Sequence, residues 1–141
     1  MRVLGAPREI MPWLCERAGC ALTSEARAIV AITDHGAIAG MVGYDLWTEN
    51  SVWMHIALAS PAALRSLIVP GFEYPFVHGK KNVALVMVRS TNSRSYDLCQ
   101  RLGFREGYRV KDGIRAGEDM VFMEMRKAEC RWLGQKMRKA A

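Results

Sequence analysis

The side chains of this sequence best suited to proton transfer are His55, Cys99 and Tyr96. An imidazole titrates near neutral pH, so His55 could act as a general base. A thiol has an ordinary pKa of about 8.5, so Cys99 could protonate a departing thiolate. Tyr96 precedes Cys99 by one turn of a predicted helix and lies on an adjoining face, which makes it an alternative donor. Each could instead be a packing residue: a hydrogen-bonded strand histidine, a buried thiol, and a core or surface aromatic.

The other cysteines and histidines do not form a metal-binding pattern. No two cysteines have CxxC spacing and the histidines stand far apart, so a local zinc site is not expected. We expect reduced thiols that pack as small buried hydrophobes, with Cys99 as the one exception. The cysteines are Cys15, Cys20, Cys99 and Cys130, and the histidines are His35, His55 and His78.

The predicted strands place His55 in the middle of a sheet. Apolar, β-branched and aromatic runs over residues 28–32, 37–46 and 52–58 are separated by turn sequences, which predicts a three-stranded antiparallel meander. Alternation along the third run puts Trp53, His55 and Ala57 on one face. Residues 2–4 are taken as the first strand, and the continuous apolar run 83–88 is typical of a central strand covered on both faces.

Helix signals fall between these strands. Pro7 to Cys20 has helical apolar spacing, and Ser60-Pro61 predicts the start of a helix that Pro70-Gly71 should end. Asn92 or Ser93 caps a third helix that ends at Gly103. Residues 104–110 and 119–125 resume strand character around a turn region at 111–117. A final basic helix is predicted over residues 127–139, with Cys130, Leu133 and Met137 on one side.

Length, composition and charge limit the classes of protein to consider. The chain has 141 residues, 50% of them hydrophobic, which suits one domain (residues 1–126) followed by a basic tail (residues 127–141). No stretch approaches the ~20 apolar residues of a membrane span, and the N-terminus lacks the apolar core of a signal peptide, so we expect a cytoplasmic protein. The net charge of +6 is concentrated in residues 126–141, which contain six basic residues and one acidic residue, Glu129. Residues 1–125 are therefore nearly neutral, which argues against a domain-wide nucleic-acid surface.

The segment from Asn92 to Phe104, ending in Leu-Gly-Phe, resembles the most recognisable segment of the GCN5-related N-acetyltransferase (GNAT) family. The predicted order of elements and the closing pair of strands after Phe104 are similar to that family over residues 1–126. The chain resembles more closely the short acetyltransferase-like proteins of tailed bacteriophages. The resemblance implies an α+β fold with a mostly antiparallel sheet of about seven strands, splayed between the fourth and fifth and flanked by helices.

The resemblance also implies acetyl-CoA as co-substrate and a direct attack of an amine on its thioester. His55 would be the base, with Cys99, at a position where many members have Tyr, or Tyr96 as the acid. Backbone near the end of the fourth strand and the following helix N-terminus would hold the cofactor. The family's glycine-containing phosphate turn is absent after Pro61. The expected cofactor contacts are Ala57, Leu58, Ala59, Arg65, Ser66 and Asn92.

Three functions remain open from the sequence. The leading one is acetyl-CoA-dependent N-acetylation of a primary amine on a small molecule or protein. The first alternative is a non-catalytic binding protein with the same fold, such as a phage-encoded host-interaction or virion-associated protein. The second is nucleic-acid binding through the basic tail, although a solvated or dimer-packing C-terminal helix is the favoured interpretation of that tail. The sequence determines neither the acceptor nor the oligomeric state, for which a homodimer is one option.

Overall fold

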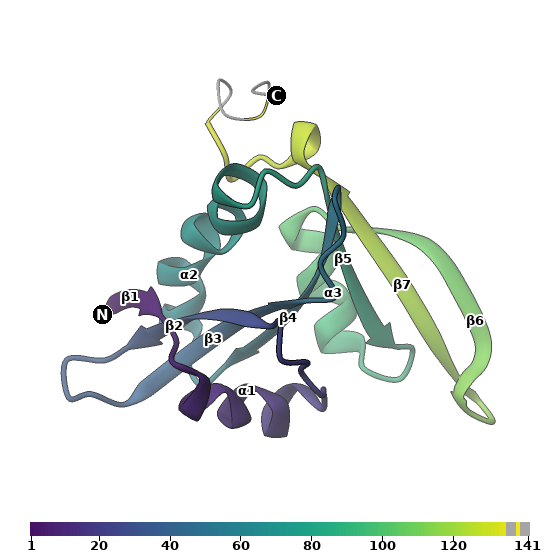
Figure 1. The fold of residues 1–141 in the computed structure, drawn as a ribbon. Helices are drawn as coiled ribbons and strands as arrows, with labels where there is room; N and C mark the ends of the chain where they lie inside the picture. Colours follow the sequence, from purple (N-terminus) through teal and green to yellow (C-terminus); the bar gives the residue numbers. More distant parts are fainter. Residues whose placement is uncertain (135–137, 139–141) are drawn as a thin grey trace.

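A computed structural model describes residues 1–134 and residue 138. Its described part contains one seven-stranded sheet in the order β1-β2-β3-β4-β5-β7-β6 (Figure 1). Neighbouring strands are antiparallel except β4 and β5, which are parallel. This confirms the predicted meander and the mostly antiparallel sheet. The strands are β1 Arg2–Gly5, β2 Arg27–Ile32, β3 Ile38–Asp45, β4 Ser51–Leu58, β5 Val83–Arg89, β6 Arg105–Arg115 and β7 Glu118–Arg126.

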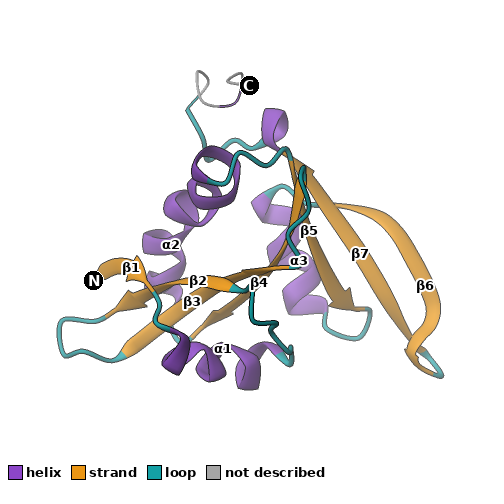
Figure 2. Cartoon of the chain, viewed as in Figure 1, coloured by secondary structure: helices purple, strands orange, loops and turns teal. Residues whose placement is uncertain are grey.

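The helices cover both faces of the sheet (Figure 2). Helix α1 (Met11–Ala18) packs on one face, where it closes a small core with β2, β3 and β4. Helices α2 (Pro61–Glu73) and α3 (Ser93–Leu102) bury their apolar sides in the larger core on the other face. Short 3-10 helices span Arg8–Ile10 and Lys127–Glu129. No helix in residues 1–134 is long and apolar enough to cross a membrane.

Two glycines of β3 let helices approach its opposite faces closely. A Cβ on Gly43 would lie 2.5 Å from Cδ2 of Leu14, which is fully buried on α1. A Cβ on Gly40 would lie 3.0 Å from Cβ of Ala63 on α2. Both helices therefore sit tightly against β3, next to the strand that carries His55.

Helix α2 runs past the point where the sequence predicted its end. Pro70 lies inside the helix, and a π-helical turn, Tyr74–His78, continues it. The prediction failed because burial offsets the backbone hydrogen bond that Pro70 cannot donate. Phe72 and Phe76 are buried with their ring centroids 6.2 Å apart. The Tyr44 hydroxyl donates to the Gly71 carbonyl at 2.6 Å, which fixes this stretch to β3.

Three further expectations need correction. Strand β5 is buried on one face only, because Met87 on the other face is 41% exposed.

The expected turn region 111–117 is mostly part of a long β6, with an irregularity between Val110 and Arg115. Residues 127–134 form a 3-10 turn and further turns instead of the start of an α-helix, because Cys130 and Leu133 are drawn into the larger core. Met137 lies outside the described residues.

Candidate functional site

Strands β4 and β5 pair at one end and separate at the other. The parallel register covers Ser51–Trp53 on β4 and Val83–Leu85 on β5. No β5 partner is found in the described residues for β4 from Met54 to Leu58. Beyond Leu85, β5 pairs with β7 alone, so the two halves of the sheet diverge. The predicted splay between the fourth and fifth strands is confirmed.

The open part of β4 presents unused backbone groups to this gap. Ala59 donates its N–H to the Ala39 carbonyl at 2.7 Å, so the odd-numbered residues of this part of β4 are the ones that hydrogen-bond to β3. In an antiparallel pair, alternate residues direct both backbone groups to the same neighbour. The N–H and C=O of Ile56 and Leu58 therefore point away from β3, toward the gap. Buried backbone groups need partners, so this edge suits an extended ligand that hydrogen-bonds as a strand would.

A cavity of about 190 Å³ lies in the gap and brings several predicted site residues together. His55 reaches it from β4, and Cys99 reaches it from α3. Asn92, at the N-cap of α3, also lines it, and its Oδ1 accepts the Ser95 N–H at 3.1 Å. The capping role predicted for Asn92 is thus confirmed, while its cofactor contact stays a prediction. The C-terminal end of α1 closes the cavity with Arg17, Ala18 and Gly19.

His55 is half-buried in the middle of β4, as the alternation predicted. Burial lowers the pKa of its imidazole, and the nearby Asp45 carboxylate offsets this only in part. Burial alone would raise the pKa of Asp45, but hydrogen bonds from Thr23 outweigh burial and lower it. Thr23 donates its N–H and its hydroxyl to the two Asp45 oxygens, both at 2.6 Å. His55 is therefore neutral near pH 7 and can accept a proton.

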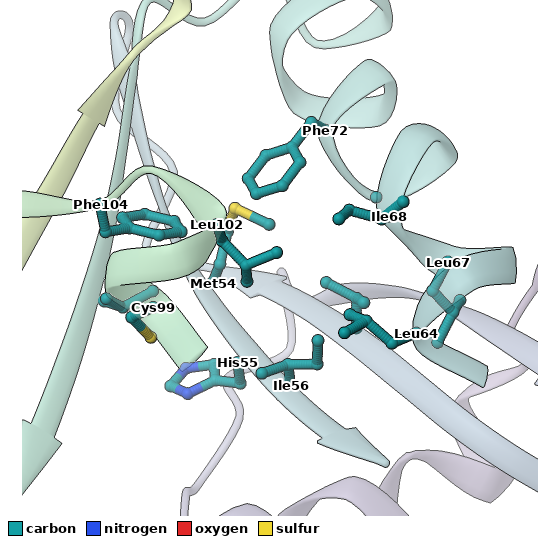
Figure 3. A pocket seen from close by; sticks show the side chains of 13 residues that line it. Met54, His55, Ile56, Leu64, Leu67, Ile68, Phe72, Cys99, Leu102 and Phe104 are labelled. Carbon is teal, nitrogen blue, oxygen red and sulfur yellow. The ribbon is translucent and has the colours of Figure 1, made fainter. Parts of the chain in front are cut away.

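Cys99 faces His55 across the inner end of the gap. Both side chains also line a small apolar cavity of about 30 Å³ beneath α2, where Figure 3 shows the Cys99 sulfur directed toward the imidazole. Cys99 is buried, and burial raises the pKa of its thiol to about 11. The thiol therefore stays protonated at neutral pH, and it is a weaker acid than an ordinary cysteine.

Tyr96 lies away from both cavities. Its hydroxyl hydrogen-bonds to Oε1 of Glu106 on β6 at 3.2 Å. Burial and this bond to Glu106 raise the pKa of the phenol. The structure thus brings His55 and Cys99 together and leaves Tyr96 outside their cavity.

A larger cavity of about 580 Å³ adjoins the first one, and Ile56 and Ser95 line both. Its floor is Leu58 and Ala59 at the end of β4, and Pro61 at the start of α2. Its other wall is α3, which contributes the basic side chains Arg94 and Arg101 and the acidic Asp97. This cavity joins the free β4 backbone, a helix N-terminus and two cationic side chains, a combination that suits a phosphate-bearing chain.

Some of the predicted cofactor contacts line these cavities and others do not. Leu58 and Ala59 line the larger cavity as expected. The Ala57 side chain packs in the small core under α1, and its backbone groups point to β3 and not to the gap. Arg65 and Ser66 line neither cavity, and Arg65 is exposed on α2.

Sequence reasoning missed four arginines that line the two cavities, Arg17, Arg89, Arg94 and Arg101. Arg94 and Arg101 are seven residues apart on one helix, so they share a face, and that spacing is a signal in the sequence. Arg17 belongs to α1, whose position beside the gap follows from its tertiary packing. No local pattern marks it.

Solved structures with this architecture include acetyltransferases. Spermidine/spermine N-acetyltransferase SpeG from Vibrio cholerae, in complex with manganese ions, matches with a TM-score of 0.71 and 13% identity over 89% of this chain and 91% of that chain. Glutamate-to-glutamine mutant forms of the same enzyme match with a TM-score of 0.75 and 12% identity over 99% of each chain. This chain has the GCN5-related N-acetyltransferase fold.

A third match to the GNAT fold is the dodecameric spermidine N-acetyltransferase from Vibrio cholerae in an intermediate state. Its TM-score is 0.70 at 13% identity, over 89% of this chain and 92% of that chain. Neither the comparison with protein-family models nor that with curated proteins gives a match. Identities of 12–13% establish the shared fold, so the activity of this GNAT-fold chain is argued from its own site.

Proposed function

We propose that the protein transfers an acetyl group from acetyl-CoA directly to a primary amine. The observation that carries the proposal is the opening between β4 and β5, where a neutral, half-buried His55 faces a cavity that adjoins a second, partly cationic one. Ile56 and Ser95 line both cavities, so one extended ligand can reach from the second into the first. The fold shared with acetyltransferases supports the same reaction.

The residues present fit acetyl-CoA as a co-substrate. The free N–H and C=O of Ile56 and Leu58 suit the amide groups of its pantetheine arm. Arg94 and Arg101 suit its phosphates, and the N-terminus of α2 adds a favourable dipole. These contacts take the place of the glycine-containing turn that the sequence lacks after Pro61.

In this proposal His55 acts first as the general base and then as the general acid. Its neutral imidazole takes a proton from the amine as the amine nitrogen bonds to the thioester carbonyl carbon. The C–S bond then breaks, and the departing thiolate needs a proton. Cys99, with a pKa of about 11, is a poor source for a thiolate of ordinary pKa, about 8.5. Protonated His55 is the stronger acid and returns the proton, while Cys99 lines the cavity beside it.

Calorimetry with acetyl-CoA tests the cofactor site first. We expect micromolar binding that Arg94→Ala and Arg101→Ala each weaken by about tenfold, because each removes one charge-assisted phosphate contact. Arg2→Ala is the matched control, since Arg2 is an exposed arginine on the far edge strand β1. A folded protein that fails to bind millimolar acetyl-CoA would exclude the enzyme.

One observation favours a second candidate, a non-catalytic binding protein with this fold. The N-terminus of α2 has Pro61 at its first position, which lacks an N–H, and the sequence after it has no glycine before Gly71 for close phosphate approach. In this case the gap would bind a partner, and acetyl-CoA would not compete. The same calorimetric titration separates the two candidates.

The remaining proposals concern the setting of the enzyme. Reduced thiols and a CoA thioester substrate both fit the cytoplasm.

Self-association as a homodimer has support from the Vibrio cholerae enzyme of the same fold, which is dodecameric. Residues 1–126 form the acetyltransferase-like domain in this proposal, and 127–141 form a basic tail whose Cys130 and Leu133 pack into the larger core and whose Lys136 and Lys139 lie outside the described residues. Light scattering of the full chain and of a chain shortened at Gly134 measures what the tail adds.

A further inference from the structure

We propose that the acceptor is an amine that also carries a negatively charged group, such as a carboxylate or phosphate, and that it is not a polyamine. This inference rests on the proposed function and names the substrate class of the same site. It starts from the charges around the cavity in the β4–β5 gap. In the described part of the chain, the Lys and Arg side chains that line this cavity are Arg17 and Arg89, and no Asp or Glu lines it.

Arg17 lines the cavity and has no carboxylate partner among the described residues. It is held in place near the end of α1 by Trp13. The guanidinium carbon lies 4.2 Å from the Trp13 ring centroid, and Nη1 donates to the Trp13 carbonyl at 3.3 Å. These contacts orient the guanidinium and leave most of its N–H donors for a ligand.

Arg89 approaches the cavity from the end of β5 and is only loosely paired. Its Nη1 lies 3.7 Å from Oε1 of Glu118. The same oxygen is 2.8 Å from Nε of Arg115, and Thr91 hydrogen-bonds to the other oxygen. Glu118 therefore shares its charge between two arginines and the Thr91 hydroxyl, so it neutralises Arg89 only in part.

Two acidic groups beside the cavity in the β4–β5 gap are already engaged. Asp45 acts on His55 through its charge, but both its oxygens accept hydrogen bonds from Thr23 and its side chain is 1% exposed. Glu118 is bonded as described and only 6% exposed. Asp45 cannot receive an ammonium group from the cavity without losing its hydrogen bonds from Thr23, and Glu118 is shared between Arg89 and Arg115.

A polyamine would bring positive charge close to the two arginines of the cavity. When one amine is neutral and poised to attack beside His55, the other amines remain cationic and lie near Arg17 and Arg89. Like charges at short range oppose binding, while a carboxylate or phosphate there forms charge-assisted bonds with guanidinium groups. The fold relatives are described as spermidine acetyltransferases, so the difference lies in the acceptor cavity and not in the fold.

Three amines of similar length test the inference: 4-aminobutyrate, n-butylamine and putrescine, which differ in the group at the far end. With the wild-type protein saturated by CoA, we expect 4-aminobutyrate to bind at least about tenfold more tightly than butylamine, and putrescine most weakly. The order of kcat/KM with acetyl-CoA should be the same. Putrescine or spermidine as the best ligand, or no preference among the three, would overturn the inference.

Substitutions at the two arginines make the test specific. Arg17→Gln and Arg89→Gln should each reduce the preference for 4-aminobutyrate over butylamine by about tenfold, and Arg17→Glu should favour putrescine. Arg2→Glu, the same charge change at the far edge strand, should leave the preference unchanged. Unaltered preferences in all the cavity variants would overturn the inference even if acetyl-CoA binds, whereas a failure to bind acetyl-CoA would remove the proposed function itself.

Discussion

The two ends of β4 differ in what their backbone does. At the closed end, Ser51–Trp53 pairs with β5, and loop contacts reinforce the junction. There, Asn82 Nδ2 donates to Asn50 Oδ1 at 2.7 Å, and Lys81 Nζ donates to the Thr48 carbonyl at 2.6 Å. At the open end, Met54 to Leu58 has β3 on one side and a cavity on the other. One strand thus provides both the link between the two halves of the sheet and a free edge.

The contrast explains where the chemistry lies. Unpaired strand edges attract other strands and are normally shielded or closed. Here the free edge faces the interior gap between β4 and β5, so a ligand of strand-like form can use it without exposing it to other chains. His55, Cys99 and Arg17 all converge on the open end. Substitutions at the open end should therefore affect function, and those at the closed end should affect stability.

The largest effect is expected at the open end, for His55→Gln. Glutamine keeps a polar side chain of similar size but cannot accept a proton, so kcat/KM should fall by about 10²–10⁴-fold. Acetyl-CoA affinity should stay within about twofold, because the cofactor contacts proposed above involve other residues. Steady-state kinetics and calorimetry measure the two quantities.

The pH profile gives the same substitution a second readout. Burial lowers the pKa of His55, so the neutral form persists below the ordinary value of about 6.5 and is lost as the pH falls through the lowered pKa. The wild-type kcat/KM should therefore show an acid limb below that value, and His55→Gln should lack it. An acid limb that survives in the variant would assign the base to another group.

The comparison also shows what the sequence could predict. Strands, the helix cap at Asn92 and the stop at Gly103 are local signals, and all three appear in the structure. The prediction at Pro70 failed because the buried Phe72 and Phe76 outweigh a local helix-breaking signal.

The site was predictable only where alternation or helical spacing determines it. His55 could be placed on its strand face from the sequence, and Arg94 and Arg101 could have been paired by their spacing. Arg17 could not, because its distance from the gap depends on how closely Leu14 packs over Gly43. Tertiary packing, which no short segment encodes, sets that distance.

A smaller effect, on stability alone, is expected at the closed end for Val52→Ala. Val52 is fully buried between the sheet and the larger core. Removing its two methyl groups should lower the free energy of unfolding by about 2 kcal/mol, from lost burial and a residual cavity. Chemical denaturation measures this loss, and kcat/KM at low temperature should stay near wild type. A large loss of activity in a fully folded Val52→Ala protein would show that the closed end controls the width of the gap.

The smallest effect is expected for Arg65→Ala, which sets the boundary of the open end. The sequence made Arg65 a candidate phosphate contact, but the structure leaves it exposed on α2 and outside both cavities. An exposed substitution of this kind changes interaction energies by about 0.5 kcal/mol or less, so the acetyl-CoA dissociation constant should change by less than about twofold. A tenfold loss would mean that the phosphates lie along α2 and not along α3, because only then would Arg65 and not Arg94 be the residue in contact.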